Sequence, residues 1–296
     1  MENWFFWDPD PISFVVPGIN RPIAWYGVFF ALGFFVGFYL LRHLCTRYFG
    51  ATTDWTPEEI KKKSHLFSER LTLYMVIATV VGARLGHILF YENLGEYLRH
   101  PIEIIKTWEG GLASHGGAIG ILIAIVLFAR RSRKDFPFIS SIRVIDLLVV
   151  PALLVGTFIR LGNFVNQEVL GTVTHLPWGV IFGHPIDGSI PEPRHPAQLY
   201  EALFYFSSFL VFCRFFPRLL YPRGRLAGWF FITTFGFRMV IEFIKEEQST
   251  FFHSFLTMGQ VLSIPFILLG VALLIKKPLL KEQEEGADQR ASSRLH

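Results

Sequence analysis

Three arginines and one histidine stand out in this sequence because their types and positions suit chemistry on an anion. Arg84, Arg160 and Arg238 lie within long apolar runs, and His115 lies between two glycine pairs in the segment GGLASHGG. A guanidinium stays charged and presents a planar fork of donors that matches phosphate. An imidazole exchanges protons near neutral pH. Together these residues predict an anion-binding site that contains one group able to accept a proton.

The segment IRLGNFVNQEVLG places further polar residues directly after Arg160. Asn163 and Asn166 could donate to phosphate or glycerol oxygens, and they could also cap the end of a helix. Glu168 follows them and adds a carboxylate. We therefore expect the chain after Arg160 to supply both donors and an acid to one site.

Two more pairs of polar residues share a helix face because of their spacing. Glu242 follows Arg238 by four residues, so the two side chains can form an ion pair. In RHPAQLYEAL, Gln198 and Glu201 are three residues apart, and Glu201 could pair with an arginine or with the histidine. We expect Gln198 and Glu201 to support the site from beside the reacting groups.

The glycines of GARLG and HGGAIG suit close contacts. Gly82 and Gly86 have a spacing that lets membrane helices approach closely. Gly116 and Gly117 remove side chains beside His115, which opens space for backbone or for substrate.

The elements that must position these residues are membrane helices. Of the 296 residues, 51% are hydrophobic and 32 are Phe, a composition too apolar for an ordinary soluble domain. Apolar runs of spanning length, about 20 residues each, predict an all-α polytopic membrane protein. Seven transmembrane helices are expected, at about residues 22–41, 71–91, 112–129, 144–163, 198–213, 226–244 and 257–275.

The distribution of basic residues predicts how these helices are oriented. Fifteen lysines and arginines lie in the loops 42–70, 130–143 and 214–225, whereas five lie in 1–21, 92–111, 164–197 and 245–256. Because loops rich in Lys and Arg stay in the cytoplasm, the N-terminus is expected outside and the C-terminus inside. The segment 164–197 then forms a small loop region on the outer face. Cys45 and Cys213 fall near inner helix ends, on a reducing side, so no disulfide is expected.

This orientation places nearly all polar residues of the helices in the outer half of the membrane. The exception is Asp146, for which we expect an interfacial ion pair with Arg143. Ionisable groups within a span are costly and should face a cavity or a partner, and a single pair could also only lock helices together. A transporter should instead show polar groups near the midplane and a route to both faces. The pattern favours an enzyme acting on a lipid head group, with a membrane transporter or lipid-binding receptor as the alternative.

Five segments, GGLASHGG, RLGNFVNQE, HPAQLYE, GFRMVIEF and LTMGQVLSIP, in this order on seven helices, resemble the bacterial prolipoprotein diacylglyceryl transferase family. The resemblance covers roughly residues 12–277. It implies a transferase of the cell inner membrane that moves the sn-1,2-diacylglyceryl group from phosphatidylglycerol to the lipobox cysteine thiol of a prolipoprotein. Glycerol 1-phosphate is released, and the active site faces the outer leaflet. The resemblance implies no cofactor, no metal and no nucleic-acid partner; another lipid-modifying enzyme on the same scaffold is the alternative.

The resemblance also implies residue roles. Arg160 matches the family's essential, phosphatidylglycerol-binding arginine, His115 and Tyr26 match its essential histidine and tyrosine, and Arg238 matches the arginine of the sixth helix. With the residues singled out above, the expected substrate-binding set is Arg160, Asn163, Asn166, Glu168, Gly171, Arg84, Glu242, Gln198 and Glu201. The chain departs from the usual family pattern at Ile159, Thr234 and Lys245.

The reaction expected is nucleophilic substitution at the glyceryl C3 carbon, in which the cysteine thiolate attacks and the phosphate ester oxygen leaves. A free thiol with a pKa of about 8.5 is mostly protonated at neutral pH, so His115 is expected to act as the base. Arg160 and Arg238 would stabilise the charge that grows on the phosphate. Tyr26 would orient the phosphate or the histidine. We expect residues 1–280 to form a single transmembrane catalytic domain and 281–296 a disordered cytoplasmic tail.

Overall fold

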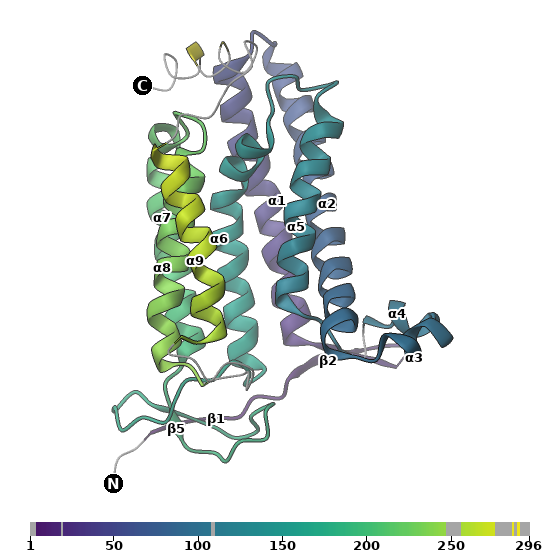
Figure 1. Ribbon diagram of the computed structural model, residues 1–296, viewed down its shortest axis with the longest axis vertical. Helices are drawn as coiled ribbons and strands as arrows, with labels where there is room; N and C mark the ends of the chain where they lie inside the picture. Colours follow the sequence, from purple (N-terminus) through teal and green to yellow (C-terminus); the bar gives the residue numbers. More distant parts are fainter. Residues whose placement is uncertain are drawn as a thin grey trace. The chain divides into compact units, whose positions relative to one another are not determined.

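The computed structural model of the protein describes residues 4–18, 20–107, 110–246, 256–275, 286 and 289–290 (Figure 1). The chain divides into two compact units. The first unit comprises residues 1–40 and 148–278, and the second comprises residues 41–147 and 279–296. The predicted tail, 281–296, lies outside the described residues except for positions 286, 289 and 290.

Helices account for most of the described chain, and all seven predicted apolar runs are helical. Six helices are long and apolar enough to cross a membrane: α1 (Trp25–Thr52), α2 (Pro57–Tyr91), α5 (Ser114–Ser132), α6 (Ser141–Val165), α7 (Ala197–Leu219) and α8 (Arg225–Ile241). A seventh apolar helix, α9 (Met258–Ile275), is shorter. The protein is therefore a mostly helical polytopic membrane protein.

The expectation of an all-α fold is wrong in the segments between the apolar runs. Residues before α1 and between α6 and α7 form short strands: β1 (Phe5–Trp7), β2 (Ile12–Val16), β3 (Arg21–Ala24), β4 (Val180–Phe182) and β5 (Pro193–Arg194). Two short helices, α3 (Leu94–Arg99) and α4 (Ile102–Ile105), follow α2. Lipid forces apolar segments into helices because it offers no partner for a free backbone group, but segments outside the apolar runs are free of that constraint.

In the first unit, the strands pack against the end of α6. β1 runs parallel to β4, with Trp7 opposite Phe182, and β4 runs antiparallel to β5. The Trp7 ring stacks on Phe164 with centroids 4.8 Å apart, and its Nε1 donates to the Phe164 carbonyl over 3.1 Å. Phe164 and Phe182 share a small buried core with Leu170 and Val180. The N-terminal strand is thereby fixed to the last turn of α6. In the same unit α8 packs beside α7 and α9, as Figure 1 shows.

In the second unit, α2 and α5 pack side by side through glycines. A Cβ atom added to Gly116 would overlap the backbone of both Gly82 and Gly86. One added to Gly117 would lie 3.5 Å from the Thr79 carbonyl oxygen. Gly116, directly after the predicted histidine, therefore allows two helix backbones to approach, which is the first of the two uses expected of these glycines, whereas Gly117 has room for a Cβ.

In the second unit, local polar contacts stabilise the first turns of both α2 and α6. Thr56 and Glu59 form a capping box that begins α2 well before its apolar run, with the Thr56 N–H donating to Glu59 Oε2 over 2.8 Å. The predicted pair of Arg143 and Asp146 is confirmed, with Nη1 and Oδ2 3.2 Å apart and both side chains fully buried. Cys45 is a free thiol, as is Cys213 of the first unit.

Gly116→Ala tests the packing of α2 on α5. The added methyl group has no room against the α2 backbone, so we expect a loss of about 1–3 kcal/mol in the free energy of unfolding and a lower thermal midpoint in detergent. Gly236→Ala in α8 is the matched control, because a Cβ there meets no atom within 4 Å and alanine is the better helix former. Equal midpoints for the two variants would contradict this packing.

Candidate functional site

Arg160, near the end of α6, is the centre of a polar cluster in the first unit. Its Nε lies 3.2 Å from Oε2 of Glu201 on α7, and its Nη1 donates to Asn163 Oδ1 over 3.0 Å. Tyr205, one helical turn after Glu201, interacts with the same guanidinium. Glu201 has 0% of its side chain exposed, so this carboxylate depends on its cationic partners. Of the two partners considered for Glu201, an arginine or the histidine, the structure shows the arginine.

The turn after α6 brings a second carboxylate to the cluster. Asn163 donates through Nδ2 to Glu168 Oε1 over 2.7 Å, and the Asn166 side chain also interacts with this carboxylate. Gln198 on α7 donates to the Glu168 carbonyl oxygen over 2.7 Å. Burial raises the pKa of Glu168 above its usual value, although the hydrogen bond from Asn163 opposes that shift. The six predicted residues from the α6 end and the α7 start therefore form one connected network: Arg160, Asn163, Asn166, Glu168, Gln198 and Glu201.

Tyr26, at the start of α1, joins this network through a glycine contact. A Cβ added to Gly162 would lie 3.1 Å from the Tyr26 ring, so the absence of a side chain there admits the tyrosine beside the last turn of α6. The Tyr26 hydroxyl interacts electrostatically with Glu168 and with Arg160. Tyr26 thus lies in the electrostatic neighbourhood of Arg160 and Glu168.

Gly171 links the cluster to the segment that follows α8. Its backbone bridges to Lys245, and its N–H donates to the His195 carbonyl over 3.2 Å. A Cβ on Gly171 would overlap His195, so only glycine fits between the two strands of chain. Lys245 Nζ lies 3.8 Å from Glu201 Oε1, and burial lowers the pKa of this lysine. The role of Gly171 in the structure is to bring Lys245 to the buried carboxylate.

Arg238 and Glu242 do not form the ion pair that their spacing predicts. Among the described residues, Arg238 has no carboxylate within ion-pair distance and no hydrogen-bond acceptor for its guanidinium, which is half-buried. α8 ends at Ile241, and Glu242 begins a short 3-10 turn (Glu242–Ile244), so the regular helix face that would align the pair ends between them. Tyr205 and Lys245 interact electrostatically with Arg238 as well as with Arg160, which places both guanidinium groups in one neighbourhood.

The Glu242 carboxylate instead lies against the first turn of α9. A Cβ on Gly259 would overlap it, so glycine at this position makes the contact possible. The start of α9 is fixed by Thr257, whose N–H donates to Gln260 Oε1 over 3.1 Å while its hydroxyl accepts from the Gln260 N–H. A carboxylate at a helix N-terminus is stabilised by the exposed N–H groups there. The Glu242 carboxylate therefore lies beside the start of α9 and away from Arg238, although its Oε2 accepts no hydrogen bond from the described residues.

Arg84 lies in the second unit and is held by backbone carbonyls. Its Nε donates to Ile104 over 3.0 Å, its Nη2 to Glu103 over 2.6 Å, and its Nη1 to Gly110 over 2.9 Å and to Gly111 over 3.3 Å. Gly110 and Gly111 have φ angles of 95° and 70°, a conformation that glycine adopts without strain. Arg84 thus organises the loop that leads into α5, and this geometry favours a supporting role over direct contact with substrate.

His115 lies in the first turn of α5, at the end of the loop that Arg84 organises. Its ring contacts Phe90, with centroids 5.3 Å apart, and Tyr91, at 5.6 Å. The imidazole is half-buried, and within the described part of the chain neither ring nitrogen has a hydrogen-bond partner. Both nitrogens are therefore available to a substrate.

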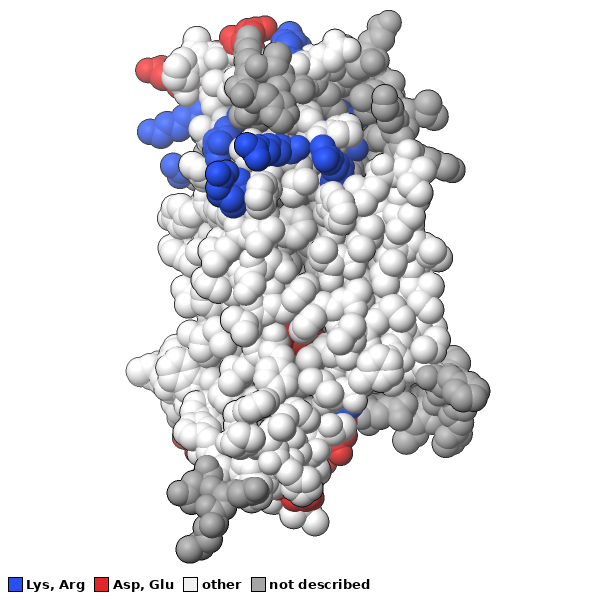
Figure 2. All heavy atoms as spheres, turned by 90° about the vertical axis from the view of Figure 1, so that its left-hand side faces the viewer, with Lys and Arg blue, Asp and Glu red and all other residues white. Residues whose placement is uncertain are grey.

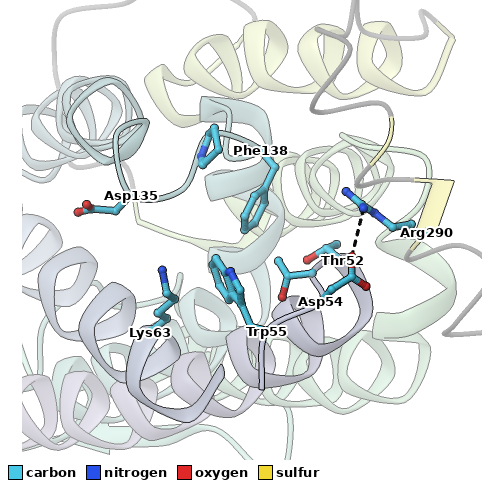
Figure 3. Close-up of a pocket in the computed structure, with 9 residues that line it drawn as sticks. Thr52, Asp54, Trp55, Lys63, Asp135, Phe138 and Arg290 are labelled. Atoms are coloured by element: carbon cyan, nitrogen blue, oxygen red, sulfur yellow. Dashed lines mark hydrogen bonds and ion pairs between the residues drawn. The ribbon is translucent and has the colours of Figure 1, made fainter. Parts of the chain in front are cut away.

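A separate hollow of 560 Å³ lies in the second unit, where α1 ends and α2 begins. Figure 3 shows Trp55, Lys63 and Phe138 lining it, with Asp54 joined to Arg290 over 3.5 Å. The hollow is at the opposite end of α2 from Arg84 and contains none of the predicted site residues. Within the described residues, no group of three or more His, Cys, Asp or Glu side chains is placed to hold a metal ion.

Several residues of the network were not predicted to belong to it. Gln167 and Asp8 form a part-buried hydrogen bond next to Glu168, and Gly259 lies against Glu242. Lys245 was noted only as a departure from the family pattern. The glycine at 259 precedes Gln260 in LTMGQVLSIP, so that motif carried a signal. Nothing in the sequence indicates that residues 8 and 167 meet, because 159 positions separate them.

These features define a polytopic membrane protein with clustered charges at one end of its helices. A family model described as prolipoprotein diacylglyceryl transferase matches residues 11–276. The chain is 42% identical to the phosphatidylglycerol–prolipoprotein diacylglyceryl transferase of Chloroherpeton thalassium, covering 93% of this chain and 95% of the relative. It is 41% identical to that of Tolumonas auensis (91% and 96% covered) and 31% identical to that of Protochlamydia amoebophila (93% and 95% covered). The chain belongs to the prolipoprotein diacylglyceryl transferase family.

Arg84→Met tests the role of the carbonyl contacts. The substitution leaves buried carbonyl groups without donors, and we expect it to lower the free energy of unfolding by more than about 2 kcal/mol. Protease cleavage within residues 92–111 should accelerate. Arg99→Met in α3 of the same segment is the control, since Arg99 is exposed and, among the described residues, pairs only with Glu96. A variant at Arg84 with wild-type unfolding and cleavage would show that the loop does not depend on this arginine.

Proposed function

We propose that the protein transfers the diacylglyceryl group of phosphatidylglycerol to the lipobox cysteine of prolipoproteins, and that Arg160 and Arg238 bind the phosphate. Membership of the family supports the reaction, and it favours an enzyme over the transporter or receptor alternative. The substrates are those that the relatives' names state. The residue roles below are our assignment.

The observation that carries the phosphate assignment is the difference between the two arginines. Arg160 is committed to Glu201 and Asn163, whereas Arg238 has a half-buried guanidinium without an acceptor among the described residues. Even a partly buried cation within a membrane span is expected to face a partner or a polar cavity. A phosphate next to Arg238 would supply the missing acceptor with charge-assisted, bidentate hydrogen bonds.

The chemistry is a displacement at carbon. The thiolate sulfur forms a bond to C3 of the diacylglyceryl group, the C3–O bond to phosphate breaks, and its electron pair stays on the leaving glycerol phosphate. Two guanidinium groups stabilise the charge that develops on that oxygen. Arg160, held by Glu201 and Asn163, keeps a fixed direction, and Arg238 adds the second cation. Tyr26 orients the phosphate beside Arg160.

The remaining predicted residues support these groups. Asn163, Asn166 and Glu168 fix the end of α6, and Gln198 holds the turn through the Glu168 carbonyl. The other supporting positions are Gly171, Glu201, Glu242 and Arg84, each through the contact described above. His115 is assigned as the base that takes the thiol proton, because within the described residues its ring nitrogens have no hydrogen-bond partner and imidazole is the side chain that commonly serves as a general base.

The proposal includes an orientation in the bacterial plasma membrane. The N-terminus and the site lie toward the outer leaflet, and the C-terminus lies in the cytoplasm. The count of 15 basic residues in one set of loops against five in the other supports this orientation. Figure 2 agrees with it, since Lys and Arg side chains gather near one end of the face shown and the middle of that face is nearly uncharged.

Arg238→Met tests the phosphate assignment. Removing one group that stabilises a developing charge should lower kcat/KM for phosphatidylglycerol by about 10²-fold to 10³-fold, and Arg238→Lys should fall in between because it keeps charge without the fork. Arg225→Met is the control, an exposed arginine in the first turn of the same helix. Transfer is measured on a lipobox peptide in phosphatidylglycerol micelles. Near-normal transfer by Arg238→Met would refute the assignment.

His115→Gln tests the base. If the imidazole takes the thiol proton, raising the pH toward the thiol pKa, about 8.5, should restore much of the lost activity because the thiolate then forms unaided. The ratio of wild-type to variant kcat/KM should therefore shrink steadily between pH 6.5 and pH 9. A ratio that stays constant over this range would mean that His115 only positions a substrate.

A further inference from the structure

The turn that presents Glu168 has an unusual backbone. Gln167 has a φ of 53° and Val169 has a φ of 60°, so both residues that flank Glu168 are left-handed. Side chains disfavour this conformation, and a β-branched residue such as Val169 disfavours it most. Such a turn persists only when its surroundings hold it in place.

The Gln167 side chain is clamped at both ends of its amide. Its Nε2 donates to Asp8 Oδ1 over 3.1 Å, and its Oε1 accepts from the His184 N–H over 2.7 Å. The Gln167 carbonyl accepts from the Ile186 N–H over 3.1 Å. Only 3% of Gln167 is exposed, so losing either partner would leave a buried polar atom unpaired.

The clamp is built from the ends of two parallel strands. Asp8 directly follows β1, and Gly183 and His184 directly follow β4, so the parallel pairing of the strands places these residues at one edge. A Cβ on Gly183 would overlap the Asp8 carboxyl group. Asp8 Oδ1 also lies 2.6 Å from His184 Nδ1, and hydrogen bonds from His184 and Gln167 lower the pKa of Asp8. The carboxylate that receives Gln167 is thus ionised and fixed.

The turn connects directly to the arginine. Glu168 accepts from Asn163, and Asn163 accepts from Arg160, all within the first unit. A rotation of the turn at Gln167 would move the Glu168 carboxylate and break its hydrogen bond with Asn163. Arg160 would keep Glu201 but lose the contact that fixes its Nη1.

We propose that Gln167 is a positioning residue for the transfer reaction: clamped between Asp8 and the His184 N–H, it holds Glu168 on Asn163 and so orients Arg160. This inference rests on the proposed binding of phosphate by Arg160. Gln167 itself does not touch the substrate. Its effect is expected on recognition of phosphatidylglycerol rather than of the peptide.

Gln167→Gly separates the clamp from the backbone conformation. Glycine adopts a positive φ without strain, so the variant keeps the turn accessible while both amide contacts disappear. We expect the KM for phosphatidylglycerol to rise about tenfold, with the KM for the lipobox peptide within about twofold of wild type. Wild-type KM values for both substrates would overturn the inference, because the Gln167 amide would then have no effect on substrate recognition.

Exchanging the amide at position 167 with the carboxylate at position 8 is the decisive part of the experiment. Gln167→Glu alone sets two carboxylates against each other and should lower kcat/KM for phosphatidylglycerol about tenfold or more. Combined with Asp8→Asn, the new amide at position 8 can donate to the new carboxylate at position 167, which still accepts from His184. We expect the double variant to recover to within about threefold of wild type, at the wild-type thermal midpoint. A double variant no better than Gln167→Glu would overturn the inference.

Arg160→Lys, run in parallel, separates this inference from the proposed function. Lysine cannot reach Glu201 and Asn163 together as the planar guanidinium does, so transfer should fall sharply. If it falls while the Gln167 variants behave as wild type, the phosphate assignment stands and Gln167 has no positioning role. If Arg160→Lys transfers normally, the phosphate assignment fails and this inference fails with it.

Discussion

The buried ion pair between Arg160 and Glu201 is the contact on which the arrangement of the first unit depends. A carboxylate with 0% exposure on an apolar helix is tolerated only with a partner, and removing one member of such a pair typically costs about 3–5 kcal/mol. The pair joins α6 to α7. Lys245 comes to the same carboxylate from the segment after α8, and Asn163 reaches the same guanidinium from the next turn of α6. Three separate parts of the chain are thereby held around one charge.

The three intramembrane arginines have different partners, and the partners separate their roles. Arg84 donates hydrogen bonds to four backbone carbonyls and so fixes the loop before α5. Arg160 binds a carboxylate and an amide. Among the described residues Arg238 has neither, and the carboxylate four residues after it lies against Gly259 at the start of α9. The three arginines thus divide into one that anchors a loop, one that is oriented by its partners and one that is available, and only the last two lie in one unit with Tyr26 and Glu168.

The features that could be predicted from the sequence are those that depend on long apolar segments. Each apolar run became a helix because lipid leaves no alternative. The cost of burying a carboxylate alone predicts that Glu201 is paired, but the sequence left open whether its partner is an arginine or the histidine. Features that depend on where a helix ends were not predictable. The spacing of Arg238 and Glu242 suggested a pair, but α8 stops between them. The small sheets depend on pairing between distant segments, and the left-handed turn at Gln167 has no glycine to mark it.

An experimental structure of the protein in nanodiscs that contain phosphatidylglycerol tests the central claim most directly. The account predicts a phosphate with its oxygens about 2.7–2.9 Å from guanidinium nitrogens of both Arg160 and Arg238, with Arg160 still paired to Glu201 and Glu242 still at the start of α9. A phosphate bound elsewhere, with Arg238 turned onto Glu242, would contradict it.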